Sequence, residues 1–197
     1  MDGFQRRRER KKESIRRAAL ELYSKYGVQK VRVAEIAKKA KVSQVTIYNY
    51  FGGKNELLRD VISRLLNEKL QEHIELVETD LPFPEKIEKF ISEKTRDLAA
   101  LNPDFLKSIM SEDPAIKEMV EDFAKYRFIP LMLNFIEKGK NDGYINKSIS
   151  TEAILLYINI FKEAKRSDML LDQEQNQRLF KELATLFYYG LLGKPRE

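Results

Sequence analysis

The segment from Ser43 to Lys54 carries side chains whose types and spacing suit contacts with nucleic acid. Ser43 is a residue type that often caps a helix N-terminus, and Gln44, Val45 and Thr46 follow it. In the first turn of such a helix, a glutamine amide can pair with adenine, and valine and threonine methyl groups can contact a thymine methyl. We predict that these three side chains contact base edges in the major groove.

Other polar side chains in this segment suit phosphate groups. Tyrosine and serine hydroxyls can donate to phosphate oxygens, and an ammonium group at the start of a helix can share a phosphate with the N-terminal N–H groups of that helix. We predict DNA backbone contacts from Ser43, Tyr48, Tyr50 and Lys54. An ordinary surface or packing role stays open for each of them, as it does for the three predicted base contacts.

Short helices between longer ones must position these side chains. Apolar residues at helical spacing predict one helix from about Ile15 to a stop at Gly27, and a long helix that starts at Lys54. Between them the pattern predicts two very short helices, over residues 33–40 and 43–51. Such short helices are stable only when they pack on their neighbours. Two of them joined by a short turn are typical of a helix-turn-helix.

Positive charge is concentrated at the N-terminal end of the chain. Residues 1–54 hold 15 Lys and Arg against 5 Asp and Glu, whereas the remainder holds 21 against 26. A net charge of +10 on the first segment and −5 on the rest favours a polyanion partner for the N-terminal segment alone. Charge runs are also common on solvated helix faces, and the run Arg6–Lys12 is expected to fray at its start.

The composition disfavours several classes of function. The sequence has no cysteine, so it offers no disulfide or thiolate site, and its single histidine, His73, is expected to face solvent. The basic N-terminus lacks an apolar segment, and the densest apolar run, Ala153–Phe161, is shorter than the roughly 20 residues that span a membrane. We therefore expect a cytoplasmic protein that is not an enzyme, binds no metal or cofactor, and has no membrane partner.

The residues from Val33 to Leu58 resemble the DNA-binding signature of the TetR family of transcriptional regulators. In that family an "IA..AGVS.GTLY.YF..K..L" pattern spans the second and third helices and the start of the fourth. The segment Leu22–Gly27 is similar to the end of the family's first helix. The residues that match the pattern are Ile36, Ala37, Ala40, Val42, Ser43, Thr46, Ile47, Tyr48, Tyr50, Phe51, Lys54 and Leu57 or Leu58.

This resemblance implies an all-α fold with an N-terminal three-helix helix-turn-helix DNA-binding domain and a C-terminal helical ligand-binding and dimerisation domain. The expected division is residues 1–54, with the helix-turn-helix at about 32–51, and residues 55–197, with about nine helices in all.

The resemblance also implies a repressor that binds a palindromic operator in double-stranded DNA as a homodimer. A small, apolar or amphipathic effector would release it from DNA. The alternative is a helical architectural or adaptor protein that binds DNA without a ligand response. Only the repressor would keep a large ratio of specific to non-specific affinity.

Three positions depart from the family pattern. Glycine usually stands where Lys41 and Val45 are found, so Lys41 is expected to need a strained backbone conformation while adding a charge that can reach phosphate. Arg32 stands where a Thr or Ser cap usually precedes the second helix, so it gives up the cap hydrogen bond and brings a cation within reach of phosphate. We add Arg32 and Lys41 to the predicted backbone contacts.

The C-terminal part has clear helix signals. Asn102, Asp113, Ser150 and Asp172 are expected N-caps, and Pro130 is expected to kink or break a helix. Two helices here are apolar around most of their circumference, so each has to be buried on both sides. This pattern predicts a two-fold dimer interface. The expected interface residues are Ile154, Tyr157, Ile158, Phe161, Leu179, Leu183, Leu186 and Phe187.

Aromatic and methionine side chains of the middle helices could line an apolar ligand pocket. Such stripes at helical spacing are more often plain core, so a purely structural role stays open for each residue. No polar cluster identifies the chemistry of the ligand. The expected lining residues are Phe90, Phe105, Met119, Phe123, Tyr126 and Phe128.

Overall fold

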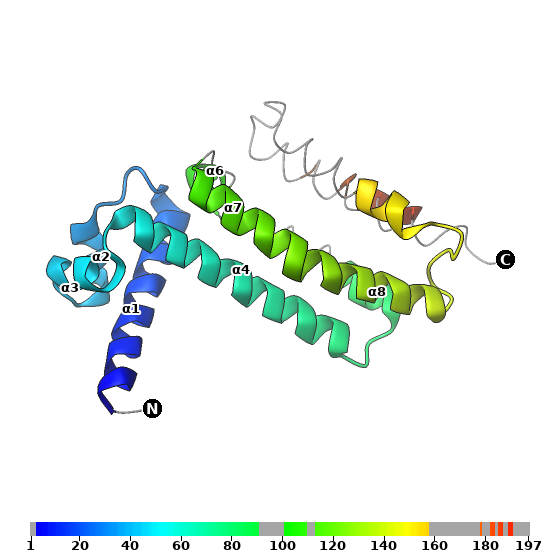
Figure 1. Ribbon diagram of the computed structural model, residues 1–197, viewed down its shortest axis with the longest axis horizontal. Coiled ribbons are helices and arrows are strands. Elements are labelled where there is room, and N and C mark those ends of the chain that lie inside the picture. Colours follow the sequence, from blue (N-terminus) through cyan, green and yellow to red (C-terminus); the bar gives the residue numbers. More distant parts are fainter. Residues whose placement is uncertain are drawn as a thin grey trace. The chain divides into compact units, whose positions relative to one another are not determined.

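The computed structural model describes residues 3–90, 101–109 and 113–157, together with residues 178, 182, 183, 185, 186, 189 and 190. Every regular element within these residues is helical, as the sequence predicts (Figure 1). Residues 83–90 and 151–157 are helical. The other elements are α1 (Gly3–Tyr26), α2 (Val33–Ala40), α3 (Gln44–Phe51), α4 (Lys54–Glu78), α6 (Pro103–Ile109), α7 (Pro114–Phe123), the π-helical turn η1 (Ala124–Phe128) and α8 (Ile129–Asn141).

The chain divides into two compact units. The first contains residues 1–69 and 100–121, and the second contains residues 70–99 and 122–197. Helix α4 therefore begins in the first unit and ends in the second, while α6 and most of α7 belong with the N-terminal helices. The predicted domain boundary after residue 54 stays a prediction.

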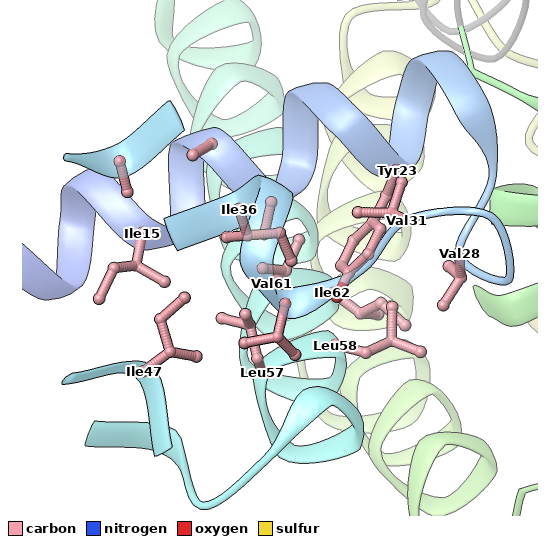
Figure 2. Close-up of a cluster of buried hydrophobic side chains, with 14 of the residues drawn as sticks. Ile15, Tyr23, Val28, Val31, Ile36, Ile47, Leu57, Leu58, Val61 and Ile62 are labelled. Atoms are coloured by element: carbon pink, nitrogen blue, oxygen red, sulfur yellow. The ribbon is translucent and has the colours of Figure 1, made fainter. Parts of the chain in front are cut away.

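The core of the first unit is built from apolar side chains that the helical period places on one face of each helix. Ile15 and Tyr23 of α1, Ile36 of α2 and Ile47 of α3 are all fully buried. Figure 2 shows them meeting Leu57 and its neighbours on α4. Because α2 and α3 have only eight residues each, this burial is what keeps them folded.

A later part of the chain completes the same core. Phe105 of α6 is fully buried in it, with its ring centroid 6.0 Å from that of Tyr23. The backbone N–H of Asn102 donates to the carbonyl oxygen of Ser24 at 2.8 Å. A Cβ at Gly27, where φ is +79°, would lie 2.9 Å from Asp104 Cβ. The start of α6 thus closes the C-terminal end of α1. Only glycine fits at position 27, because of its positive φ and the close approach of Asp104.

An arginine on α1 joins it to α4. Arg16 Nε donates to Asp60 Oδ2 at 2.5 Å and Nη2 donates to Asp60 Oδ1 at 3.3 Å, so the pair is bidentate. Arg16 Nη1 also donates to Glu9 at 2.6 Å. Bidentate arginine–carboxylate pairs combine strength with geometric specificity. This pair fixes the start of α4, and hence the turn before it, against α1.

The second unit has a core of its own. Phe83 stacks on Phe135 of α8 at a centroid distance of 4.7 Å and on Tyr144 at 5.5 Å. A Cβ at Gly139 would lie 2.3 Å from Phe83 Cζ, so the ring requires glycine there. The buried Lys86 ammonium donates to the carbonyl oxygen of Val77 at 2.7 Å, which supplies the partner that a buried charge needs.

A kink or break is predicted at Pro130, but the helical path runs without a break from Pro114 to Asn141 and contains the π-helical turn η1 just before the proline. The N–H of Ile129 donates to the carbonyl oxygen of Ala124, five residues earlier. Proline has no N–H, and its ring clashes with the carbonyl four residues before it. The wide turn accommodates both effects, and the helix continues as α8 with the proline in its first turn.

Three of the four predicted helix caps are confirmed. Asn102 Oδ1 accepts from the N–H of Asp104 at 2.9 Å, Asp113 Oδ1 accepts from two N–H groups of α7 at 3.0 and 3.1 Å, and Ser150 Oγ accepts from the N–H of Ala153 at 3.1 Å. The Asp172 cap lies outside the described residues. Within the described part of the chain, no helix combines the length and apolar character that a bilayer crossing requires.

The Tyr23 hydroxyl predicts a stabilising substitution. It is buried without a hydrogen-bond partner among the described residues, and this burial raises its pKa. Because a buried unpaired hydroxyl costs about 1–3 kcal/mol, Tyr23→Phe is expected to raise the free energy of unfolding by about 1 kcal/mol in urea titration. Tyr23→Leu, which also removes the ring, is expected to lower it. A loss of stability in the phenylalanine variant would show that the hydroxyl is satisfied.

Candidate nucleic-acid interface

The turn between α2 and α3 is formed by a strained lysine and a serine cap. Lys41 has φ 56° and ψ 46°, in the left-handed region, so the strained conformation predicted for it is confirmed. It is the only non-glycine residue with positive φ among the described residues. Ser43 Oγ accepts from the N–H of Thr46 at 3.1 Å, which confirms the predicted cap. The turn therefore fixes the direction in which α3 leaves α2.

The N-terminus of α2 is capped from inside the helix. Arg32 takes the N-cap position, and a guanidinium has no acceptor to offer. The carboxylate of Glu35 accepts from the N–H of Arg32 at 2.7 Å instead, which is the glutamate half of a capping box. The Arg32 side chain is exposed, so it carries no role in holding the helix end.

Helix α3 has one buried side and one open side. Ile47 is fully buried, whereas Val45 is 65 % exposed and Tyr48 is 50 % exposed. Gln44 is exposed beside Val45, and Thr46 is half-buried with its hydroxyl 2.9 Å from Ser43 Oγ. The three predicted base-contacting residues thus form the N-terminal end of a helix that is anchored by its opposite face.

The C-terminal end of α3 lies under basic side chains of α1. Arg8 lies over the ring of Tyr50 at 5.6 Å, and Lys12 and Arg16 lie over the ring of Phe51 at 5.8 Å each. Contacts of this kind contribute about 0.5–1 kcal/mol when exposed. Arg8 and Lys12 were not among the predicted site residues. Arg8 and Lys12 are four residues apart in a basic run, so the sequence indicated that they share one face of α1. It did not indicate that this face lies against α3.

Lys54 stands at the first position of α4 and is half-buried. Burial lowers the pKa of its ammonium group, and the nearby carboxylate of Glu35 partly opposes this shift. Desolvation also strengthens any pairing with an anion. Lys41 is exposed and Tyr50 is half-buried. The structure thus leaves every predicted backbone-contacting residue at least partly accessible.

The predicted ligand-pocket residues are divided between the two units. Phe105 and Met119 pack in the core of the first unit. In the second unit, Phe90 is buried and Phe128 is half-buried, with ring centroids 6.4 Å apart. The other two, Phe123 and Tyr126, also belong to the second unit, and Tyr126 is 64 % exposed.

The expectation that His73 faces solvent is wrong. Its ring lies 4.3 Å from that of Phe90 and 6.0 Å from that of Phe128, in edge-to-face geometry in both cases. The residue is half-buried. Phe90 belongs to a different helix, so the polar neighbours of His73 along its own helix did not show that an aromatic pair covers it.

The predicted dimer-interface residues are only partly described. Ile154 is buried in the core of the second unit, Tyr157 is 38 % exposed and Leu186 is 64 % exposed. Leu183 is half-buried. The remaining four, Ile158, Phe161, Leu179 and Phe187, lie outside the described residues.

The sequence that forms this interface matches a known protein family. The model for "Bacterial regulatory proteins, tetR family" matches residues 15–61. The uncharacterized HTH-type transcriptional regulator YhgD of Bacillus subtilis is 33 % identical over 79 residues, which are 40 % of this chain and 41 % of YhgD. YvdT of the same organism, also an uncharacterized HTH-type regulator, is 39 % identical over 62 residues, 32 % of each chain. The chain thus matches less than half the length of either relative.

Solved structures share the fold over almost the whole chain. The fatty acid degradation regulator FadR from Bacillus halodurans is 20 % identical, with a TM-score of 0.64 over 92 % of this chain and 96 % of that one. NemR from E. coli is 16 % identical, with a TM-score of 0.66 over 94 % and 100 %. FadR from Bacillus subtilis, solved with stearoyl-CoA, is 18 % identical, with a TM-score of 0.61 over 91 % and 98 %.

The backbone conformation of Lys41 predicts the effect of two substitutions. A side chain in the left-handed region costs about 1–2 kcal/mol, part of which is offset by the greater freedom of glycine in the unfolded chain. Lys41→Gly is expected to raise the free energy of unfolding by about 1 kcal/mol in thermal or urea denaturation. Lys41→Ala removes the same charge but keeps the strained Cβ, so it is expected to leave stability unchanged. Equal stability of the two variants would show that the turn is unstrained.

Proposed function

We propose that the chain, whose residues 15–61 match the tetR family of bacterial regulatory proteins, is a one-component transcriptional repressor. In this proposal it binds a palindromic operator as a homodimer and leaves DNA when a small, apolar or amphipathic ligand binds. The observation that carries the proposal is the open N-terminal end of α3, with Gln44 and Val45 exposed while Ile47 is fully buried. Such a helix end is free to enter a major groove while its other side stays packed.

The proposed division of labour on DNA follows from side-chain type. Gln44, Val45 and Thr46 contact base edges, because an amide and two methyl-bearing side chains can distinguish adenine and thymine. A hydroxyl or a cation is suited to phosphate oxygens instead. The proposed phosphate contacts are Ser43, Tyr48, Tyr50, Lys54, Arg32 and Lys41.

A homodimer is supported by apolar side chains that remain exposed late in the chain. Leu186 is 64 % exposed and Tyr157 is 38 % exposed, and both belong to helical parts of the second unit. A two-fold interface would cover them and would also place two copies of α3 about one DNA turn, or a small multiple, apart. A palindromic operator is the corresponding DNA sequence.

The second unit offers a chemically suitable place for the ligand. The rings of Phe90, Phe128 and His73 lie together there, so apolar surface stands beside an imidazole that can form a hydrogen bond. An amphipathic molecule suits this combination. Stearoyl-CoA, the ligand solved with Bacillus subtilis FadR, is an amphipathic molecule. Four of the six expected lining residues belong to the second unit, so we propose the ligand site there.

We propose that a ligand signal reaches α2 and α3 along the continuous helical path of α7, η1 and α8, whose residues are divided between the two units. Phe105 and Ile116 are buried in the core that holds α2 and α3, and the helical path from Pro114 runs through η1 into the second unit. Arg59 of α4 and Asp113, the cap of α7, approach within 3.7 Å. A shift of α7 would therefore act directly on the core beneath α3.

The DNA-binding roles can be tested in two steps. Genomic fragments that the protein binds are first selected and sequenced to identify the operator, and two variants are then titrated on that operator. Gln44→Ala is expected to relax base preference at one or two operator positions by roughly 1–3 kcal/mol. Tyr48→Phe is expected to weaken binding to operator and to scrambled DNA by the same factor, because it loses a phosphate contact. A change of base preference in Tyr48→Phe, or none in Gln44→Ala, would contradict these assignments.

Sedimentation of the full chain at micromolar concentration tests the dimer. We expect a dimer for the unmodified protein and a monomer for Leu186→Glu, because the exposed leucine tolerates a charge in the monomer but not in an apolar interface. Tyr126→Glu, a matched control at a residue that is also 64 % exposed, is expected to remain a dimer. A monomeric unmodified protein would refute the proposed interface.

A further inference from the structure

The first part of α1 is a basic helix that the core of the first unit does not need. The family match begins at residue 15, and Ile15 is also the first buried residue of α1. The helix itself begins at Gly3. Residues 3–14, which we call the basic arm, extend the helix by roughly 18 Å at a rise of 1.5 Å per residue. The basic arm holds six Lys and Arg and two Glu, and it is helical from its start rather than frayed.

The cations of the basic arm are arranged unfavourably for the isolated helix. Like charges four residues apart lie one above the other and destabilise a helix by about 0.2–0.5 kcal/mol for each pair. Cations in the first turns also face the positive end of the helix dipole, and no acidic residue occupies the first turn. A polyanion alongside the helix would relieve both effects. The like-charge pairs are Arg6 with Arg10, Arg7 with Lys11, and Arg8 with Lys12.

The two carboxylates of the basic arm are engaged elsewhere. Glu9 pairs with Arg16 at 2.6 Å, and Glu13 lies within 3.8 Å of Arg64 on α4. Hydrogen bonding to Arg16 lowers the pKa of Glu9. Within the described part of the chain, none of the six cations of the basic arm forms a salt bridge. The positive charge of the basic arm therefore remains available to an external anion.

The contacts of the basic arm place it beside α3. Arg8 covers the ring of Tyr50 and Lys12 covers the ring of Phe51. Both aromatic residues are in the last turn of α3, and α1 continues past that helix toward its N-terminus (Figure 1). We propose that the basic arm is a second DNA-binding element, which lies along the phosphate backbone that flanks the groove entered by α3. This inference rests on the proposed DNA-binding function.

The experiment measures the salt dependence of binding to a short duplex of scrambled sequence. In Arg7→Gln/Arg10→Gln/Lys11→Gln, three cations are removed while Arg8 and Lys12 keep their aromatic contacts. Each lost phosphate contact lowers the slope of log K against log salt by about 0.9, so we expect the slope to fall by about 2–3. Glutamine is a good helix former and two of the three like-charge pairs are relieved, so far-UV circular dichroism and thermal stability should be kept or improved.

A control variant separates a local contact from a general charge effect. Lys107→Gln/Lys138→Gln/Lys147→Gln removes the same charge at three exposed lysines outside the basic arm, and its slope is expected to equal that of the unmodified protein. If the arm variant keeps the unmodified slope, or changes no more than the control, the basic arm does not bind DNA. If the unmodified protein does not bind the duplex at any salt concentration, the proposed DNA-binding function fails as well.

Discussion

The interface depends on holding two eight-residue helices in place by the burial of very few side chains. Alone, α2 and α3 would be marginal in water, because so short a helix does not recover the cost of its first turn. Ile36 and Ile47 are each fully buried, and burying such a side chain contributes about 1.5–3 kcal/mol. Since this packing takes only one side of α3, the other side is free to carry residues chosen for contact rather than for stability.

The same requirement explains why the core extends beyond the N-terminal helices. The core between α1 and α4 is completed by Phe105 and Ile116, which come from much later in the sequence. Polar contacts reinforce this docking, since Asn102 binds the end of α1 through its backbone and, at 3.3 Å, through its side-chain amide to the carbonyl oxygen of Lys25. The element that presents α3 is thus built jointly from two stretches of chain.

Most of the local structure could be predicted from the sequence, because it depends on residues close together in the chain. The helical period predicts the two short helices, Ser43 is a recognisable cap, and Lys41 stands where the TetR pattern usually has glycine. Long-range partners could not be predicted. Phe105 comes from much later in the chain and packs beside Tyr23 in the core of the first unit, and His73, which was expected in solvent, meets Phe90.

The placement of Phe105 limits how far the two halves of the chain can be separated. A fragment that ends with α4 would lose the ring that packs beside Tyr23, as well as the groups that close α1 at Gly27. A cavity of that size in a small core typically costs several kcal/mol. The first unit is therefore not an interchangeable N-terminal module. Exchange of its first 69 residues with those of a relative would require residues 101–121 to be exchanged together with them.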